Sequence, residues 1–171
     1  MTVARKAAIT FKGNPLDLLG PELKVGDKAP ADFTLVGTDM AAVTGKDLAG
    51  KARILCAVPS LDTPVCDVEM RRFNEEAASL GAVQVYAVSL DLPFAQKRWC
   101  GATGSERIHA LSDWKHRDFG RAYGVEAPGF GLLARAVFVI GPDDVLRHVE
   151  YVPEIGQEPN YAAALAAAKA L

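Results

Sequence analysis

The sequence has few cysteines, no long apolar run and almost no net charge, and each shortage excludes a class of protein. Its three cysteines are too few for the disulfide framework of a small secreted domain, so catalytic, sensing or incidental roles fit them better. No stretch approaches the about 18 apolar residues of a membrane span, and the N-terminal residues lack the apolar core of a secretory signal. A formal net charge of −2 gives no reason to expect nucleic acid or an anionic membrane as a partner. We therefore expect a cytoplasmic protein.

Metal-binding and phosphate-binding patterns are also missing. The three histidines, His109, His116 and His148, share no metal-ligand spacing, and the sequence has no Cys-x-x-Cys pair. Gly129 and Gly131 are not followed by the Lys-Ser/Thr pair of a phosphate-binding loop. Zinc binding, dithiol isomerisation and nucleotide binding are therefore poor hypotheses.

What is present is an ordinary globular composition, with 50% hydrophobic and 23% charged residues over 171 positions. Short β-like runs alternate with helical ones, which predicts one α/β domain over residues 1–171. Their order is that of a thioredoxin-like fold, a central mixed β-sheet flanked by helices, with an N-terminal β-hairpin extension over residues 1–20. Strands are expected at 9–12, 16–19, 33–36, 53–58, 83–89, 108–112, 136–140 and 145–149, and helices at 67–79, 93–99, 115–123 and 161–171.

Two cysteines lie in settings that suit thiol chemistry. Cys66 stands where a loop opens into the predicted helix 67–79, and unpaired N–H groups and the helix dipole at such a place favour thiolate over thiol. Thr63 adds a hydroxyl three residues upstream. That environment suits a nucleophile, and the distant Cys100 suits a thiol that resolves the oxidised product.

The same residues carry a family resemblance. Pro59, Thr63 and Cys66 match the P-x-x-x-T-x-x-C signature of peroxiredoxins. Residues 91–101, which end with Cys100 and Gly101, and residues 131–140 resemble the thiol peroxidase branch, an atypical two-cysteine type that closes its disulfide within one chain. The likeness runs from the turn at 13–15 to residues 159–161, nearly the whole sequence.

The resemblance implies a mechanism. Cys66 would attack hydrogen peroxide or an organic (alkyl or lipid) hydroperoxide and become a sulfenic acid, and Cys100 would then form an intrachain Cys66–Cys100 disulfide that thioredoxin reduces. Thr63 would orient the peroxide, Arg135 would stabilise the thiolate and the developing alkoxide, and Pro59 would shield the thiolate. A homodimer and a role in antioxidant defence and redox homeostasis are implied as well, and no metal, haem, flavin or selenium is needed.

Two features depart from the usual family pattern. The segment 126–131 looks a few residues shorter than is usual, and because it is expected to border the peroxide entrance, substrate preference is the property it would change. Trp99 stands where Phe is usual, which should alter packing around the resolving thiol without removing it.

Other roles stay open for these residues. Cys56, in the middle of a predicted strand, is best read as a small buried hydrophobe. Thr63 could be a helix N-cap, Arg135 a surface charge, and Cys100 could simply pack beside Trp99. A peroxide sensor that passes its disulfide to a signalling partner would use the same chemistry at Cys66, whereas a non-enzymatic scaffold is disfavoured because it would tend to lose the thiol or its arginine.

Overall fold

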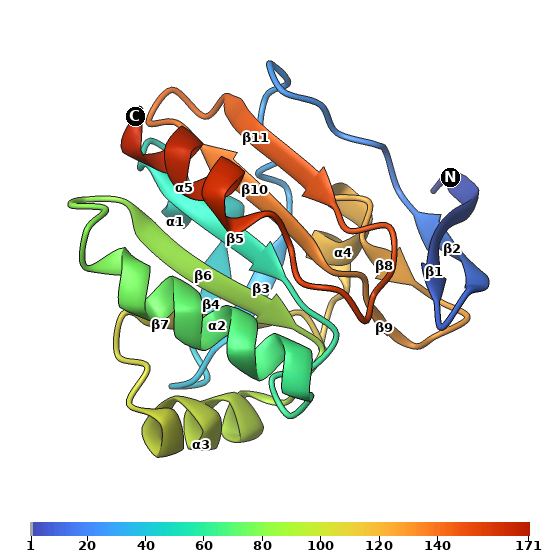
Figure 1. Cartoon of the computed structure of the whole chain (residues 1–171), viewed down its shortest axis with the longest axis horizontal. Helices are drawn as coiled ribbons and strands as arrows, with labels where there is room; N and C mark the ends of the chain where they lie inside the picture. Colours follow the sequence, from blue (N-terminus) through green and yellow to red (C-terminus); the bar gives the residue numbers. More distant parts are fainter. Residues whose placement is uncertain (1) are drawn as a thin grey trace.

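The computed structural model describes residues 2–171, so Met1 of the predicted 1–20 extension lies outside the described residues. A large sheet has the strand order β11-β10-β5-β6-β7-β3-β4, and a small one the order β1-β2-β8-β9 (Figure 1). The strands are β1 (Ala4–Phe11), β2 (Asn14–Leu19), β3 (Thr34–Gly37), β4 (Ala42–Thr44), β5 (Arg53–Ala57), β6 (Gln84–Ser89), β7 (Ile108–Ser112), β8 (Glu126–Ala127), β9 (Leu132–Leu133), β10 (Ala136–Ile140) and β11 (Leu146–Tyr151). The helices are α1 (Gly45–Leu48), α2 (Pro64–Ala77), α3 (Pro93–Thr103), α4 (Asp118–Ala122) and α5 (Tyr161–Lys169).

The large sheet is mixed. Its central strands β5, β6 and β7 run parallel, whereas β10 and β11 on one side and β3 and β4 on the other pair antiparallel. Parallel strands need crossover connections, and α2 and α3 supply them. The predicted α/β class with helices around a mixed sheet is therefore confirmed.

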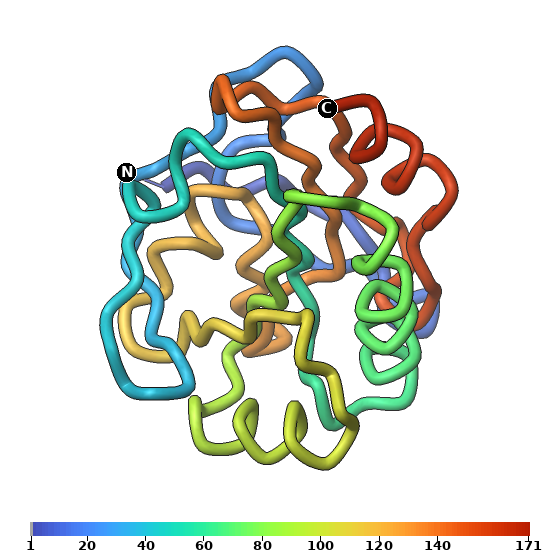
Figure 2. The backbone as a smooth tube through the Cα atoms, turned by 90° about the vertical axis from the view of Figure 1, so that its left-hand side faces the viewer, coloured from blue at the N-terminus to red at the C-terminus, as the bar shows by residue number. Residues whose placement is uncertain are grey.

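The apolar core lies on both faces of the large sheet, as β5 shows. Ile54 and Cys56 belong to a cluster with residues of α2, α3 and α5, whereas Leu55 and Ala57 belong to a second cluster with residues of α1, α4 and the small sheet. Figures 1 and 2 show α2 and α5 together over the first of these faces. Burial on both faces explains the nearly unbroken apolar run that predicted this strand.

Some predicted boundaries were wrong, and local backbone preferences explain them. α2 begins at Pro64, whose fixed φ suits the first helical position, so Cys66 lies inside the first turn. α3 continues past the predicted end to Thr103, where Gly104 ends it in the left-handed conformation. α4 begins only at Asp118, because Arg117 has a φ of 59° and cannot extend a helix.

Several elements were missed. The short strands β4, β8 and β9 and the one-turn helix α1 fall in segments without a clear hydrophobic period. Glu126 and Ala127, predicted as part of a loop, pair with β9 and attach the small sheet to the chain just before β10.

The predicted N-terminal hairpin is present, but its turn lies earlier than expected. Lys12 and Gly13 both have positive φ, as a two-residue hairpin turn requires, whereas Pro15 lies within β2 opposite Thr10. Glu154 holds this turn to the domain, since its carboxylate accepts hydrogen bonds from the Thr10 hydroxyl at 2.7 Å and the Lys12 N–H at 2.9 Å.

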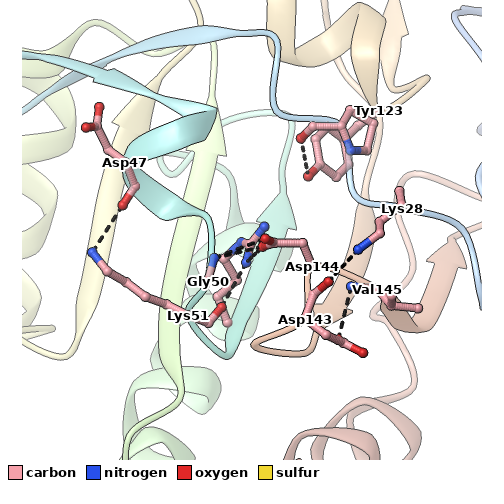
Figure 3. Close-up of polar contacts among 10 residues, drawn as sticks. Lys28, Asp47, Gly50, Lys51, Tyr123, Asp143, Asp144 and Val145 are labelled. Atoms are coloured by element: carbon pink, nitrogen blue, oxygen red, sulfur yellow. Dashed lines mark hydrogen bonds and ion pairs between the residues drawn. The ribbon is translucent and has the colours of Figure 1, made fainter.

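A second set of polar contacts closes the opposite end of the sheet (Figure 3). Asp144, in the turn between β10 and β11, accepts from the Gly50 N–H at 3.0 Å and from Nη1 of the buried Arg53 at 2.8 Å. Lys28 Nζ donates to the Asp143 carbonyl at 2.7 Å. These contacts join three chain segments that are distant in sequence.

Glu154→Gln is expected to free the hairpin turn without unfolding the domain. The hydrogen bonds from Thr10 and Lys12 lower the pKa of Glu154 from 4.5 to about 2. Its stabilisation of the turn should be complete above about pH 4.5 and lost as the pH falls through about 2. Hydrogen-exchange protection factors at Lys12 and Gly13 should follow that window in the wild type and be low at every pH in Glu154→Gln. The control is Asp17→Asn at the base of the same hairpin, and equal protection of the turn in all three proteins would contradict the argument.

Candidate active site

Cys66 lies at the carboxyl end of β5, on the first turn of the helix that follows this strand. Pro64 is the first helical residue, so Cys66 is the third, and Thr63 takes the N-cap position with an extended backbone. The first backbone N–H groups of a helix have no partner within it and point towards this end of the sheet. The Cys66 side chain has no exposed surface. It is a fully buried thiol beside a positive helix end.

The pairing of β10 with β5 brings Arg135 to this thiol. Ala136, the first residue of β10, lies opposite Ala57, the last residue of β5. Because the two strands are antiparallel, the residue just before β10 must lie beside the loop that leaves β5. Arg135 occupies that position, 69 residues from Cys66 along the chain.

The guanidinium of Arg135 is buried, and it donates hydrogen bonds to groups that surround the Cys66 thiol. Its Nη1 lies 3.3 Å from Cys66 Sγ and 2.5 Å from Glu69 Oε2, and its Nε donates to the Ile155 carbonyl at 3.0 Å. Burial acts against the charge, but Glu69 and Cys66 outweigh it and raise the pKa of Arg135. A permanent positive charge therefore faces Sγ from inside the protein.

Glu69 is a site residue that the sequence analysis missed. It follows Cys66 by three positions on α2 and is as completely buried, with Oε1 making no hydrogen bond. Burial raises the pKa of Glu69 to about 7, although Arg135 acts in the opposite direction. A carboxyl group at i+3 on the apolar face of a predicted amphipathic helix was a signal that could have been read.

The other predicted residues of the Cys66 loop lie near it with different partners. The Thr63 hydroxyl donates to the Ser60 carbonyl at 2.8 Å, which leaves its oxygen lone pairs available. No hydrogen bond between Thr63 and Cys66 is found within residues 2–171. Pro59 is buried at the bend that leaves β5. The loop is therefore held by a hydrogen bond to its own backbone, and the Thr63 hydroxyl oxygen remains able to accept a hydrogen bond.

Asp91, two residues after the end of β6, holds the Cys66 loop through hydrogen bonds to its carboxylate. Its carboxylate accepts from Ser60 Oγ at 2.7 Å, the Leu61 N–H at 2.8 Å and Ser89 Oγ at 2.7 Å. Three donors on one carboxylate hold the loop at the carboxyl edge of the parallel strands, the usual place for a site in a sheet of this kind.

All three cysteines are free thiols, and their surroundings differ. Cys100 lies on α3 and is half-buried, and burial raises its pKa. Cys56 is fully buried in β5, as predicted, and burial, with a smaller contribution from Glu69, raises its pKa well above the ordinary value. Of the three sulfurs, Cys66 Sγ is the one that an arginine contacts.

The described part of the chain, residues 2–171, has neither a metal-binding cluster nor a membrane-spanning helix. No group of three or more His, Cys, Asp or Glu side chains is arranged to hold a metal ion. No helix is long and apolar enough to cross a membrane.

Comparisons with known proteins identify the family of this chain. A family model described as Redoxin matches residues 24–165. The thiol peroxidase of Halalkalibacterium halodurans is 56% identical over 164 residues, which are 96% of this chain and 98% of the relative. The thiol peroxidase of Bacillus subtilis is 50% identical over 165 residues, with coverage of 96% and 98%.

Solved structures give the same answer for the fold. A peroxiredoxin-like protein from Aquifex aeolicus superposes with a TM-score of 0.86 at 42% identity, covering 97% of this chain and 98% of that one. A thiol peroxidase from Chromobacterium violaceum superposes with a TM-score of 0.82 at 20% identity, covering 91% of each chain, which bears on the fold alone. The thioredoxin-like fold is thereby confirmed. The chain belongs to the Redoxin family, among its peroxiredoxin-type thiol peroxidases.

Proposed function

We propose that this peroxidase reduces hydrogen peroxide and organic hydroperoxides through Cys66 and is recycled by thioredoxin. The observation that carries the proposal is Arg135 Nη1 at 3.3 Å from a buried sulfur on the first turn of a helix. The Cys66 thiolate attacks the terminal oxygen of the peroxide, and the O–O bond breaks. Sulfur becomes a sulfenic acid, and the departing alkoxide or hydroxide takes up a proton and leaves as alcohol or water.

Thiolate formation alone is too small an effect for a fast peroxidase. A thiol whose pKa fell from about 8.5 to about 6 would gain thiolate at neutral pH only about 30-fold, roughly 2 kcal/mol of barrier. A thiolate of low basicity is also a weaker nucleophile. Most of the catalysis must therefore come from donors that meet the breaking O–O bond, and the buried guanidinium of Arg135 is placed to be one of them.

Thr63 and Pro59 support the same step. The Thr63 oxygen can accept the proton of a bound hydroperoxide, because its own proton is engaged with the Ser60 carbonyl. That arrangement would aim the terminal peroxide oxygen at Cys66. Pro59 is buried and offers no N–H to water, which suits a residue that shields the thiolate.

Cys100 is proposed as the resolving thiol. Its sulfur attacks the Cys66 sulfenic acid, water leaves, and an intrachain disulfide forms. The two thiols of thioredoxin then reduce that disulfide and become a disulfide themselves, so the electrons balance over one cycle. Support comes from the position of Cys100 on α3, where its partly buried side chain packs against the apolar cluster that contains Cys66.

The homodimer and the cytoplasmic location stay predictions. Leu92 and Phe94, at the start of α3, are exposed apolar side chains of the kind that subunit contacts use. Organic hydroperoxides are the preferred substrates in this proposal.

Cys66→Ser should abolish turnover, because a serine hydroxyl stays protonated near neutral pH and cannot replace the nucleophile. Peroxide consumption with thioredoxin as donor should fall by roughly three orders of magnitude or more. The matched control is Cys56→Ser, the same change at another buried thiol, which should keep turnover with a modest loss of stability. Substantial activity in Cys66→Ser would remove the proposed nucleophile.

Cys100→Ser should separate peroxide reduction from recycling. The variant should consume about one equivalent of peroxide and then stop with Cys66 as a sulfenic acid, which a dimedone adduct would report by mass. Sustained turnover with thioredoxin in the wild type also distinguishes a peroxidase from a sensor, which needs only stoichiometric oxidation. If peptide mapping of the oxidised wild type pairs Cys66 with Cys56, the resolving residue is wrong.

Arg135→Met should slow peroxide reduction by about 10²-fold or more, the usual effect of losing one preorganised donor. Methionine keeps much of the bulk, and the orphaned Glu69 can protonate, since burial already raises its pKa to about 7. The measurement is the second-order rate constant against pH, with the thiolate fraction followed by ultraviolet absorbance. Glu69→Gln is the control, because it removes the carboxylate charge while Arg135 still faces Cys66. Full recovery of Arg135→Met at high pH would mean that the arginine only favours the thiolate.

A further inference from the structure

One hydrogen bond joins the residues adjacent to the two reactive thiols. Trp99, which precedes Cys100, donates from its indole Nε1 to Asp67 Oδ1 at 2.8 Å, and Asp67 follows Cys66. The bond connects α3 to the first turn of α2. A phenylalanine at position 99 could fill similar space but has no donor.

The Trp99–Asp67 hydrogen bond should be stronger than the exposed Arg98–Asp62 ion pair beside it. The Trp99 side chain is almost completely buried and packs in the apolar cluster that contains Cys66. Its acceptor is a carboxylate, and hydrogen bonds to charged acceptors are about twice as strong as neutral ones. The neighbouring pair Arg98–Asp62, at 3.0 Å, is exposed on both sides and therefore contributes little.

The proposed disulfide step acts against this bond. Sulfur atoms join only when their Cα atoms come within about 4.4–6.8 Å in a suitable orientation. Cys66 lies inside a helical turn with its sulfur on Arg135, and the pKa of the half-buried Cys100 is raised by burial, which makes it a poor nucleophile in the closed fold. If Cys66 leaves the guanidinium to meet Cys100, the helical turn that carries both Cys66 and Asp67 opens, and the bond to Trp99 is lost.

The structure also shows where α3 can yield. Gly101, directly after Cys100, lies inside the helix, where glycine is unfavourable, and a Cβ added there would meet nothing within 4 Å. The Trp99–Asp67 hydrogen bond opposes local opening of α3, whereas Gly101 favours it by weakening the helix.

We propose that Trp99, through Asp67, is a positioning residue that holds the closed form and slows disulfide formation. The inference rests on the proposed function, because it decides what happens to a Cys66 sulfenic acid. If α3 opens, Cys100 attacks and water leaves. If α3 stays closed, the sulfenate attacks a second peroxide, which transfers one oxygen to give a sulfinate and releases alcohol or water. The bond thereby sets the ratio of recycling to overoxidation.

Trp99→Phe tests the proposal without peroxide. In the reduced protein, alkylation of Cys100 by iodoacetamide, followed by peptide mass mapping, reports local opening. The variant should react roughly tenfold faster than the wild type, the factor expected for a charge-assisted bond. In an Asp67→Ala background the same substitution should cause no further change, which separates the hydrogen bond from indole packing. Equal rates in wild type and Trp99→Phe, or equal acceleration in both backgrounds, would overturn the proposal.

Two further variants serve as controls for Trp99→Phe, one with little expected effect and one with an effect of opposite sign. Arg98→Gln removes the exposed pair with Asp62 and should change Cys100 alkylation by less than about threefold. Gly101→Ala should slow the reaction, because it strengthens the helix. With peroxide present, Trp99→Phe should also form less Cys66 sulfinate per disulfide than the wild type, and an unchanged ratio would overturn the proposal. Absence of any peroxide reaction in the wild type would instead remove the proposed function, while the alkylation result would still stand.

Discussion

The buried guanidinium of Arg135 is the constraint on which this structure depends. A charge in the interior must be paired, since an uncompensated one costs several kcal/mol. Here Glu69, Cys66 and the Ile155 carbonyl supply the partners, and they come from two turns of α2 and from the segment after β11. Those elements are placed around β5 and β10 so that they supply the partners of one buried cation, and that cation lies against Cys66 Sγ.

The proposed recycling step places a second demand on the same arrangement. In that proposal Cys66, which is fully buried against Arg135, must also meet Cys100 on α3, and the cycle then needs two local structures. Such openings draw on the least stable segments and leave the core intact. The first turn of α2 and the helix α3 lie outside the central strands, and α3 carries Gly101, which weakens a helix by about 1 kcal/mol relative to alanine. A single hydrogen bond between α2 and α3 therefore contributes a free energy comparable with the free energy of this local opening.

Much of the fold could be predicted from the sequence, because local patterns specify it. The apolar runs of β5, β6 and β10 and the amphipathic face of α2 carry their own periodicity. The loop around Cys66 carried a motif. What could not be predicted were contacts set by strand register, because no local pattern tells that Ala136 lies opposite Ala57 and so brings Arg135 to Cys66. The resemblance supplied that contact, but it did not supply Glu69 or the carboxylate of Asp91 that holds the loop.

Cys56 and Cys66 show why burial alone does not decide the chemistry of a thiol. Both side chains are fully buried, and they lie in the same apolar cluster. Cys56 lies within β5 between β6 and β10, where its surroundings are apolar and Glu69 acts against a negative charge. Cys66 lies where the strand has ended, so it has a helix start on one side and a guanidinium on the other. Where a parallel strand ends, its backbone no longer pairs with neighbouring strands, and the N–H groups at the start of the next helix are free to donate hydrogen bonds. Reactivity is therefore a property of the position: only nine residues separate the inert setting of Cys56 from the setting in which we propose that Cys66 reacts.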